Sequence, residues 1–308
     1  MSRVVVCSRS FSRHTALKAE LTALFPDAKF NDAGTEFSEG SLIEFLKDAD
    51  MAIIGLEKVT ANVLAALPKL KVISKYGVGL DTLDLDSMRA RGVKLGWSGG
   101  VNRRSVAELT LVHMLSALRL LPELQALVKA GGWNNKTGSE LSGKCVGLLG
   151  FGFVGQEVAR LLSPFGCTLL AHDLQDKSSE ARALGVALVK PEELFSRADI
   201  LSLHIPLNAD NFHLVGEKYL NLMKPSSILI NTARGGLVDE VILADFLVKK
   251  KLRGAAFDVL ETEPPAKGNQ LVDLDNFYVS PHIGGSTTES ILAMGRAAII
   301  GLTSAALP

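Results

Sequence analysis

The sequence predicts an α/β protein in which helices cover both faces of parallel β-sheets. Short runs rich in Val, Ile and Leu recur along the chain, and segments rich in Ala, Leu, Lys and Glu separate most of them. These runs are apolar throughout, which is typical of strands buried on both faces of a parallel sheet. The chain has 308 residues, of which 47% are hydrophobic and 21% charged, as expected for a globular protein of about two domains.

The expected elements divide into two groups along the chain. In the first group, strands are expected at Val4–Ser8, Met51–Leu56, Val72–Lys75 and Lys94–Trp97, with helices such as Thr15–Phe25 and Thr60–Leu67 between them. In the second group, strands are expected at Cys145–Gly150, Thr168–Asp173, Ile200–Ile205, Ser227–Thr232, Gly254–Val259 and Phe277–Ser280. Because these are more strands than one sheet usually contains, the turn-rich segment 96–100 is the expected boundary between two domains.

One long apolar segment, Val106–Leu121, is predicted to form a helix that is buried on more than one side. Two interpretations stay open: a core helix within one subunit, or a helix that also packs against a second subunit. The segment contains His113 and Arg119, and it falls short of the ~20 apolar residues needed to span a bilayer.

Charge and cysteine content argue against several classes of protein. Thirty-three basic and 33 acidic residues cancel, so no overall charge attracts the chain to nucleic acid or to an anionic membrane. Cys7, Cys145 and Cys167 form no C-x-x-C pair, which argues against a disulfide scaffold or a structural zinc site. We therefore expect no bound metal. The N-terminal apolar run is too short for a signal peptide, so we expect a cytoplasmic protein.

A glycine-rich turn follows the expected strand Cys145–Gly150. Gly150, Gly152 and Gly155 form the motif G-x-G-x-x-G at the start of a predicted helix. In dinucleotide-binding folds these glycines allow a tight turn, a close approach of the backbone to the pyrophosphate, and close packing of helix on strand. The helix N-terminus then directs its amides at the anion. Such a motif alone is weak, but the strand before it favours dinucleotide binding over an ordinary turn.

Asp173, at the end of the next expected strand, indicates which dinucleotide is bound. It lies 18 residues after Gly155, near the ~20 expected for the carboxylate that holds the adenosine ribose hydroxyls. A carboxylate there repels the 2′-phosphate of NADP, and no Arg or Lys follows at positions 174–176. NAD is therefore the expected cofactor; otherwise Asp173 is a solvated residue at a strand end.

Three polar motifs follow the later strands and contain Arg234, Glu263 and His282. Because open α/β sheets bind ligands at the carboxyl ends of their strands, these three side chains are expected to converge. Each alone has an ordinary explanation, as a surface Arg, a turn Glu before prolines or a capping His. Together, downstream of a nucleotide fingerprint, they favour a catalytic site.

With these motifs the chain resembles the D-isomer-specific 2-hydroxyacid dehydrogenase family, nearest to its short phosphoglycerate dehydrogenase-like members. The resemblance extends from about Ile54 to Thr288 and includes Lys75–Asp81, Asn102–Glu108 and His204–Leu207. It implies two Rossmann-like, doubly wound parallel-sheet domains with a cleft between them. Residues 1–98 and 286–308 would form a flavodoxin-like substrate-binding domain, and residues 99–285 an NAD-binding domain. The resemblance also implies a homodimer.

The resemblance implies roles for individual residues. Arg234 would hold the substrate carboxylate, His282 would exchange a proton with the reacting oxygen, and Glu263 would hold His282 and raise its pKa. Cofactor contacts are implied for Gly150, Gly152, Phe153, Val154, Gly155, Asp173, His204, Ile205, Thr232, Ala233, Asp258, Gly284 and Gly285. Substrate contacts are implied for Lys75, Tyr76, Gly77, Val78, Gly79, Asn102, Arg103 and Arg104.

The implied reaction interconverts a D-2-hydroxy acid and its 2-oxo acid by hydride transfer with NAD. The resemblance narrowly favours 3-phosphoglycerate and 3-phosphohydroxypyruvate over hydroxypyruvate or glyoxylate. The phosphoglycerate dehydrogenases commonly have an Arg that reaches the substrate phosphate where this chain has Ile54, so Lys75 or the pair Arg103 and Arg104 would have to supply that charge. An NAD-sensing, corepressor-like binding protein is the alternative from a different functional class.

Overall fold

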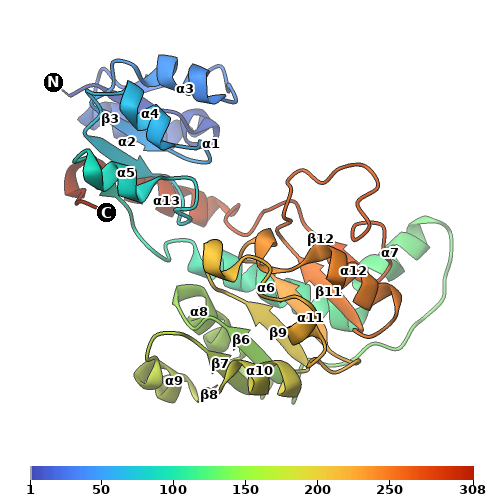
Figure 1. Cartoon of the computed structure of the whole chain (residues 1–308). Coiled ribbons are helices and arrows are strands. Elements are labelled where there is room, and N and C mark those ends of the chain that lie inside the picture. Colours follow the sequence, from blue (N-terminus) through green and yellow to red (C-terminus); the bar gives the residue numbers. More distant parts are fainter. Residues whose placement is uncertain (1) are drawn as a thin grey trace. The chain divides into compact units, whose positions relative to one another are not determined.

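The computed structural model describes residues 2–308, which form two compact units (Figure 1). The split unit contains the chain up to Asn102 together with Gly285–Pro308, and the central unit is Arg103–Gly284. Both units are α/β and every pair of neighbouring strands in either sheet runs parallel, as predicted. The domain boundaries expected from the sequence, 98/99 and 285/286, lie within a few residues of these limits.

The split unit contains a five-stranded sheet of order β2-β1-β3-β4-β5. Its strands are β1 (Val4–Val6), β2 (Lys29–Phe30), β3 (Met51–Ile54), β4 (Val72–Lys75) and β5 (Lys94–Gly96). Its helices are α1 (Arg9–Arg13), α2 (Thr15–Leu24), α3 (Glu39–Leu46), α4 (Ala61–Ala66), α5 (Leu85–Ala90) and α13 (Thr288–Ser304). Side chains of α3, α4 and α5 pack on one face of the sheet, and those of α1, α2 and α13 on the other.

Helix α13 lies against its sheet at backbone distance, because glycines face each other there. A Cβ on Gly96 would lie 2.2 Å from the carbonyl oxygen of Gly301, so no other residue fits at this position without a shift of the helix. The Ser74 hydroxyl on β4 donates to the carbonyl of Ala298 at 2.6 Å. The last helix of the chain is thereby fixed to the first sheet.

The central unit contains a seven-stranded sheet of order β12-β11-β10-β9-β6-β7-β8. Its strands are β6 (Cys145–Leu149), β7 (Thr168–His172), β8 (Ala187–Leu188), β9 (Ile200–Leu203), β10 (Ile228–Asn231), β11 (Gly254–Phe257) and β12 (Phe277–Val279). Its helices are α6 (Arg103–Arg119), α7 (Leu121–Lys129), α8 (Phe153–Leu162), α9 (Ser178–Leu184), α10 (Pro191–Arg197), α11 (Glu217–Leu220) and α12 (Glu240–Val248). The chain order reverses between β6 and β9, which is where doubly wound sheets bind their ligands.

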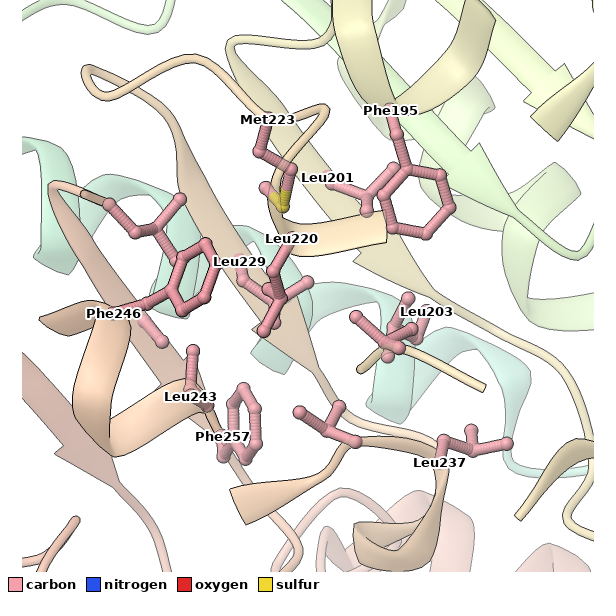
Figure 2. Packing of buried hydrophobic residues seen from close by; sticks show 14 of the residues in the cluster. Phe195, Leu201, Leu203, Leu220, Met223, Leu229, Leu237, Leu243, Phe246 and Phe257 are labelled. Carbon is pink, nitrogen blue, oxygen red and sulfur yellow. The ribbon is translucent and has the colours of Figure 1, made fainter. Parts of the chain in front are cut away.

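The core of the central unit lies on both faces of its sheet. On one face, Leu201, Leu229 and Phe257 from three neighbouring strands meet the side chains of α10, α11 and α12 (Figure 2). On the other face, α6, α8 and α9 cover the sheet. Each fully buried Leu or Phe contributes roughly 1.5–3 kcal/mol relative to an exposed side chain, so these two layers hold the strand ends in fixed positions.

Two details differ from the sequence predictions. The edge strands β2 and β8 were not expected, because each has only two residues and neither forms an apolar run. The predicted helix Val106–Leu121 ends earlier, at Arg119. Leu120 adopts a left-handed conformation (φ 55°), and α7 then starts in a new direction with Pro122 in its first turn.

Within residues 2–308, no single helix is long and apolar enough to cross a bilayer, and α6 and α7 pass such a test only when joined across their 65° bend.

Candidate active site

The predicted site residues of the central unit gather at the carboxyl edge of its sheet. The glycine-rich turn follows β6, Asp173 follows β7, and His204 follows β9. Thr232, Ala233 and Arg234 follow β10, Asp258 follows β11, and His282 and Gly284 follow β12. Parallel pairing places all these strand ends at one edge.

The glycine-rich turn forms a cradle whose inner wall has no room for side chains. Gly150 has a φ of 99°, and a Cβ there would lie 2.6 Å from the carbonyl oxygen of His204. A Cβ on Gly155 would lie 2.2 Å from the carbonyl oxygen of Gly150. By contrast, a Cβ on Gly152 would meet nothing within 4 Å, so the front of the turn is open.

The N-terminus of α8 opens into this cradle. Gly152 is the N-cap residue, and no side chain caps the helix. The amides of Phe153, Val154 and Gly155 belong to the first turn, whose N–H groups have no partners within the helix. A phosphate placed there would complete these bonds and meet the positive end of the helix dipole. The residues present therefore fit the pyrophosphate of a dinucleotide.

Asp173 is fixed beside the cradle by backbone amides. Its carboxylate accepts hydrogen bonds from the amides of Phe151 at 2.7 Å and Gln175 at 2.9 Å. The second of these closes a local turn at the end of β7, and the first ties the carboxylate to the glycine-rich turn. A negative charge therefore has a set position at the cradle's edge.

Four further residues predicted to contact the cofactor lie at the same edge. Burial lowers the pKa of His204 to about 3, so its ring is neutral, and its Nε2 atom is buried without a partner in residues 2–308. The Thr232 hydroxyl lies 2.8 Å from that of Thr110 on α6. Ile205 and Ala233 are partly buried and pack against the apolar layer of the sheet.

His282 and Glu263 form a hydrogen-bonded pair. The Nδ1 atom of His282 lies 2.7 Å from Oε2 of Glu263, and the other oxygen of that carboxylate accepts from the amide of Leu260 at 3.0 Å. The side chain of His282 is 45% exposed and that of Glu263 is 36% exposed. Because Nδ1 is bound to Glu263, Nε2 is the nitrogen through which the ring can exchange a proton with a ligand.

The pair shifts the pKa of both members. The hydrogen bond to Glu263 raises the pKa of His282, although burial and the nearby Arg234 oppose this shift. Burial acts to raise the pKa of Glu263, but the hydrogen bonds from His282 and from the Leu260 amide outweigh it, and the pKa of Glu263 falls. The pair thus favours an imidazolium beside a carboxylate.

Arg234 lies close enough to this pair to act on both of its members. Arg234 starts a tight turn, and its Nη1 atom donates to the carbonyl of Ala233 at 2.8 Å. A Cβ on the next residue, Gly235, would lie 1.9 Å from the carbonyl carbon of Leu260, so this turn packs directly on the loop that leads to Glu263. A guanidinium, an imidazole and a carboxylate are therefore grouped at one strand edge.

Asp258 holds the turn that bears His282. Its carboxylate is buried and accepts from the amides of Ile283 at 2.8 Å and Gly284 at 2.7 Å, and from the Ser280 hydroxyl at 2.5 Å. The sequence predicts a cofactor contact for Asp258, but it does not reveal that this carboxylate holds the turn. It also did not identify Ser105 and His113 of α6, which contact the same turn. The one available signal was a histidine within an apolar helical run.

The residues predicted to bind the substrate are divided between the two units. In the split unit, Lys75 is buried, and its ammonium donates to the Gly55 carbonyl and to the Thr82 hydroxyl. Tyr76 is buried with its hydroxyl 3.1 Å from that of Ser10. In the loop after β4, Gly77 has a φ of 124° and the carbonyl of Val78 accepts from the indole of Trp97.

The remaining predicted substrate contacts are consecutive in the chain, where the split unit ends at Asn102 and the central unit begins at Arg103. Asn102 is buried in the split unit, where Gly285 lies beside it. In the central unit, Arg103 is exposed at the start of α6, whereas Arg104 forms ion pairs at 2.8 Å with Glu108 and with Glu157 of α8.

Comparison with known proteins identifies a family model for the central unit. Residues 111–284 match the model described as D-isomer specific 2-hydroxyacid dehydrogenase, NAD binding domain. This match covers more than half of the chain, and it includes the glycine-rich cradle and the strand edge with Arg234, Glu263 and His282.

Individual relatives extend the match over most of the chain. The D-3-phosphoglycerate dehydrogenase of Methanocaldococcus jannaschii is 40% identical over 268 residues, which are 86% of this chain but only 51% of that protein. The chain thus spans about half the length of this relative. The hydroxypyruvate reductase of Thermotoga maritima is 35% identical over 91% of this chain and 92% of that protein. The structure of a glyoxylate reductase from Paecilomyes thermophila superposes with a TM-score of 0.89 at 25% identity, covering 98% of this chain and 94% of that one.

The fixed carboxylate of Asp173 predicts which dinucleotide this NAD(P)-binding domain prefers. We expect kcat/KM to be at least tenfold higher with NADH than with NADPH, which corresponds to ~1.4 kcal/mol of discrimination against the 2′-phosphate. Asp173→Ala should reduce this preference. Steady-state kinetics with both cofactors measure it, and Asp176→Ala, at an exposed carboxylate three residues on, is the control. Equal efficiency with NADPH in the unaltered protein would contradict the prediction.

Proposed function

The chain belongs to the D-isomer-specific 2-hydroxyacid dehydrogenase family, and on this premise we propose that it reduces a small, unphosphorylated 2-oxo acid to the D-2-hydroxy acid with NADH, and catalyses the reverse reaction with NAD. The observation that carries the proposal is the His282–Glu263 pair beside Arg234 at the sheet edge that also holds the glycine cradle. An acid–base group, an anion-binding group and a dinucleotide cradle are the parts that this reaction needs.

Each of the three residues has a defined task in this mechanism. When bound, the nicotinamide ring supplies or accepts the hydride at the reacting carbon. Arg234 binds the substrate carboxylate, because a guanidinium can hold both of its oxygens with two parallel N–H bonds. His282 gives a proton from Nε2 to the carbonyl oxygen during reduction and takes it back during oxidation. Glu263 orients the ring through Nδ1 and stabilises the imidazolium.

The surroundings of the cations expected to meet a substrate phosphate support a substrate without one. A desolvated phosphate needs at least one well-placed cation in place of its hydration. Position 54 holds an isoleucine that is fully buried, and Lys75 is engaged by Gly55 and Thr82. Arg104 is engaged by two carboxylates on α6 and α8. Hydroxypyruvate and glyoxylate, which are acted on by relatives of similar length, are the substrates we propose.

The second candidate substrate is 3-phosphohydroxypyruvate. The 40% identity to a D-3-phosphoglycerate dehydrogenase favours it, and Arg103 is an exposed cation that could meet a phosphate. A binding protein that senses NAD without turnover is the candidate from another class, and the same kinetic comparison distinguishes all three.

The substrate proposal predicts an outcome for a panel of 2-oxo acids. With saturating NADH, kcat/KM for hydroxypyruvate or glyoxylate should equal or exceed that for 3-phosphohydroxypyruvate. A preference for the phosphorylated acid above about tenfold, or ~1.4 kcal/mol, would overturn the proposal. Loss of that preference in Arg103→Ala would then locate the phosphate site. Cofactor binding with no turnover of any acid would indicate the sensing protein.

The His282–Glu263 pair predicts a pH dependence with a definite sign. Reduction needs protonated His282, so kcat/KM for reduction should fall as the pH rises through the pKa of His282, and oxidation should show the opposite trend. Glu263→Gln removes the anion that raises this pKa, so the fall should begin at lower pH. Glu261→Gln, in the same loop but bonded to His213, is the matched control. An unchanged profile in Glu263→Gln would reject the proposed function of this pair.

We also propose that the chain forms a homodimer through the apolar surface of α6, α7 and the segment after them. Val112, Leu115, Leu121, Val128 and Trp133 are all exposed there. Apolar patches of this kind are typical of subunit interfaces. Leu115→Glu should shift the protein to a monomer in sedimentation velocity, whereas Val241→Glu, at an exposed residue of α12, should not. A monomeric unaltered protein at micromolar concentration would contradict this proposal.

A further inference from the structure

Helix α6 contacts both ends of the turn that carries His282. The Ser105 hydroxyl donates to the carbonyl of Gly284 at 2.6 Å. Two turns further along the helix, Nε2 of His113 lies 3.0 Å from the Ser280 hydroxyl. Both side chains are buried within a helix that is otherwise mostly apolar on this face. A polar side chain buried in such a place costs free energy unless it is hydrogen-bonded, so these contacts define how the helix and turn fit together.

The turn needs this support because its backbone is strained at His282. This residue has a φ of 53°, in the left-handed region that side chains with a Cβ rarely adopt. Its amide donates to the carbonyl of Asp258 at 2.8 Å, and the next two amides donate to the Asp258 carboxylate. Such a conformation persists only where the surroundings determine it from several sides.

The direction of the hydrogen bonds follows from counting protons. The Asp258 carboxylate can only accept, so the single proton of the Ser280 hydroxyl is donated to it at 2.5 Å. The Ser280 oxygen must then accept from His113, whose Nε2 therefore carries a proton. Burial lowers the pKa of His113, so its ring is neutral with its one N–H at Nε2. The result is a chain of donors from His113 through Ser280 to Asp258.

We propose that His113 is a positioning residue for His282, acting through Ser280 and Asp258 on the turn that sets the contact between His282 and Glu263. This proposal rests on the proposed function only in taking His282 as the proton-exchanging group. It assigns His113 no contact with substrate or cofactor.

The proposal has a signature that a merely structural role lacks. The charged groups that act on His282 are Glu263, Asp258 and Arg234. The hydrogen bond to Glu263 has the largest effect and depends on the exact placement of the turn. If the turn relaxes, this bond lengthens and the pKa of His282 falls. A loss of packing alone would lower the melting temperature and leave that pKa unchanged.

The test measures the pKa of His282 directly, by NMR titration of the ring protons in the protein without substrate. His113→Leu keeps an apolar side chain and removes the donor, and Ser280→Ala breaks the chain at its middle. His113→Gln offers an N–H group to Ser280 again. Met114→Leu, at a buried neighbour on α6, and Ser202→Ala, at a buried hydroxyl with no described partner, are the matched controls. His282→Ala assigns the resonance.

We expect the pKa of His282 to fall in His113→Leu and Ser280→Ala, and to stay near its original value in His113→Gln and in both controls. For the two disrupted variants, kcat should fall roughly threefold to tenfold, less than the ~10²-fold expected when an acid–base group itself is removed. An unchanged pKa of His282 in a folded Ser280→Ala protein would overturn the proposal, even if turnover fell. Absence of turnover with all 2-oxo acids would instead refute the proposed function and leave the NMR result valid.

Discussion

Parallel strand pairing is the constraint on which the rest of the central unit depends. Because every strand runs the same way, each one ends at the same edge, and each loop that leaves this edge can carry a polar residue into a shared site. The backbone N–H and C=O groups of these strands form hydrogen bonds within the sheet, and the side chains of the strands are buried in two apolar layers. The loops are therefore the part of this edge that can bind ligands. The glycine cradle, Arg234, Glu263 and His282 occupy four such loops.

Within this edge, charges with opposite effects act on His282. Glu263 favours the protonated form of His282 and has the larger effect, while partial burial and Arg234 favour the neutral form. The opposing effects limit the rise of the pKa, which suits an acid–base group that must release its proton as well as take it up. The carboxylate of Asp258 has a different task, since its oxygens are directed at backbone amides and at Ser280.

Most of the fold and the strand-edge residues could be predicted from the sequence, for a physical reason. Short runs that are apolar throughout indicate buried parallel strands, and polar motifs directly after them indicate the ligand edge, so Arg234 and His282 could be located from the sequence alone. Strands β2 and β8 could not, since two residues form no pattern. Neither could the contact of His113 with Ser280, which joins residues 167 positions apart. For Lys75, the sequence showed a cation at the end of a strand, but it did not indicate that this side chain is buried and hydrogen-bonded to Gly55 and Thr82.

The hydrogen bond between Ser105 and Gly284 joins the first turn of the central unit to its last residue. The chain thus enters and leaves the central unit at adjacent points. For the split unit, the folded central unit is equivalent to a short connecting loop. Loop-closure entropy grows with the separation that a flexible chain must bridge, and a folded insert with adjacent ends removes most of it. Helix α13 follows the central unit in the chain. During synthesis, one apolar face of the first sheet therefore stays partly uncovered until the central unit has been made.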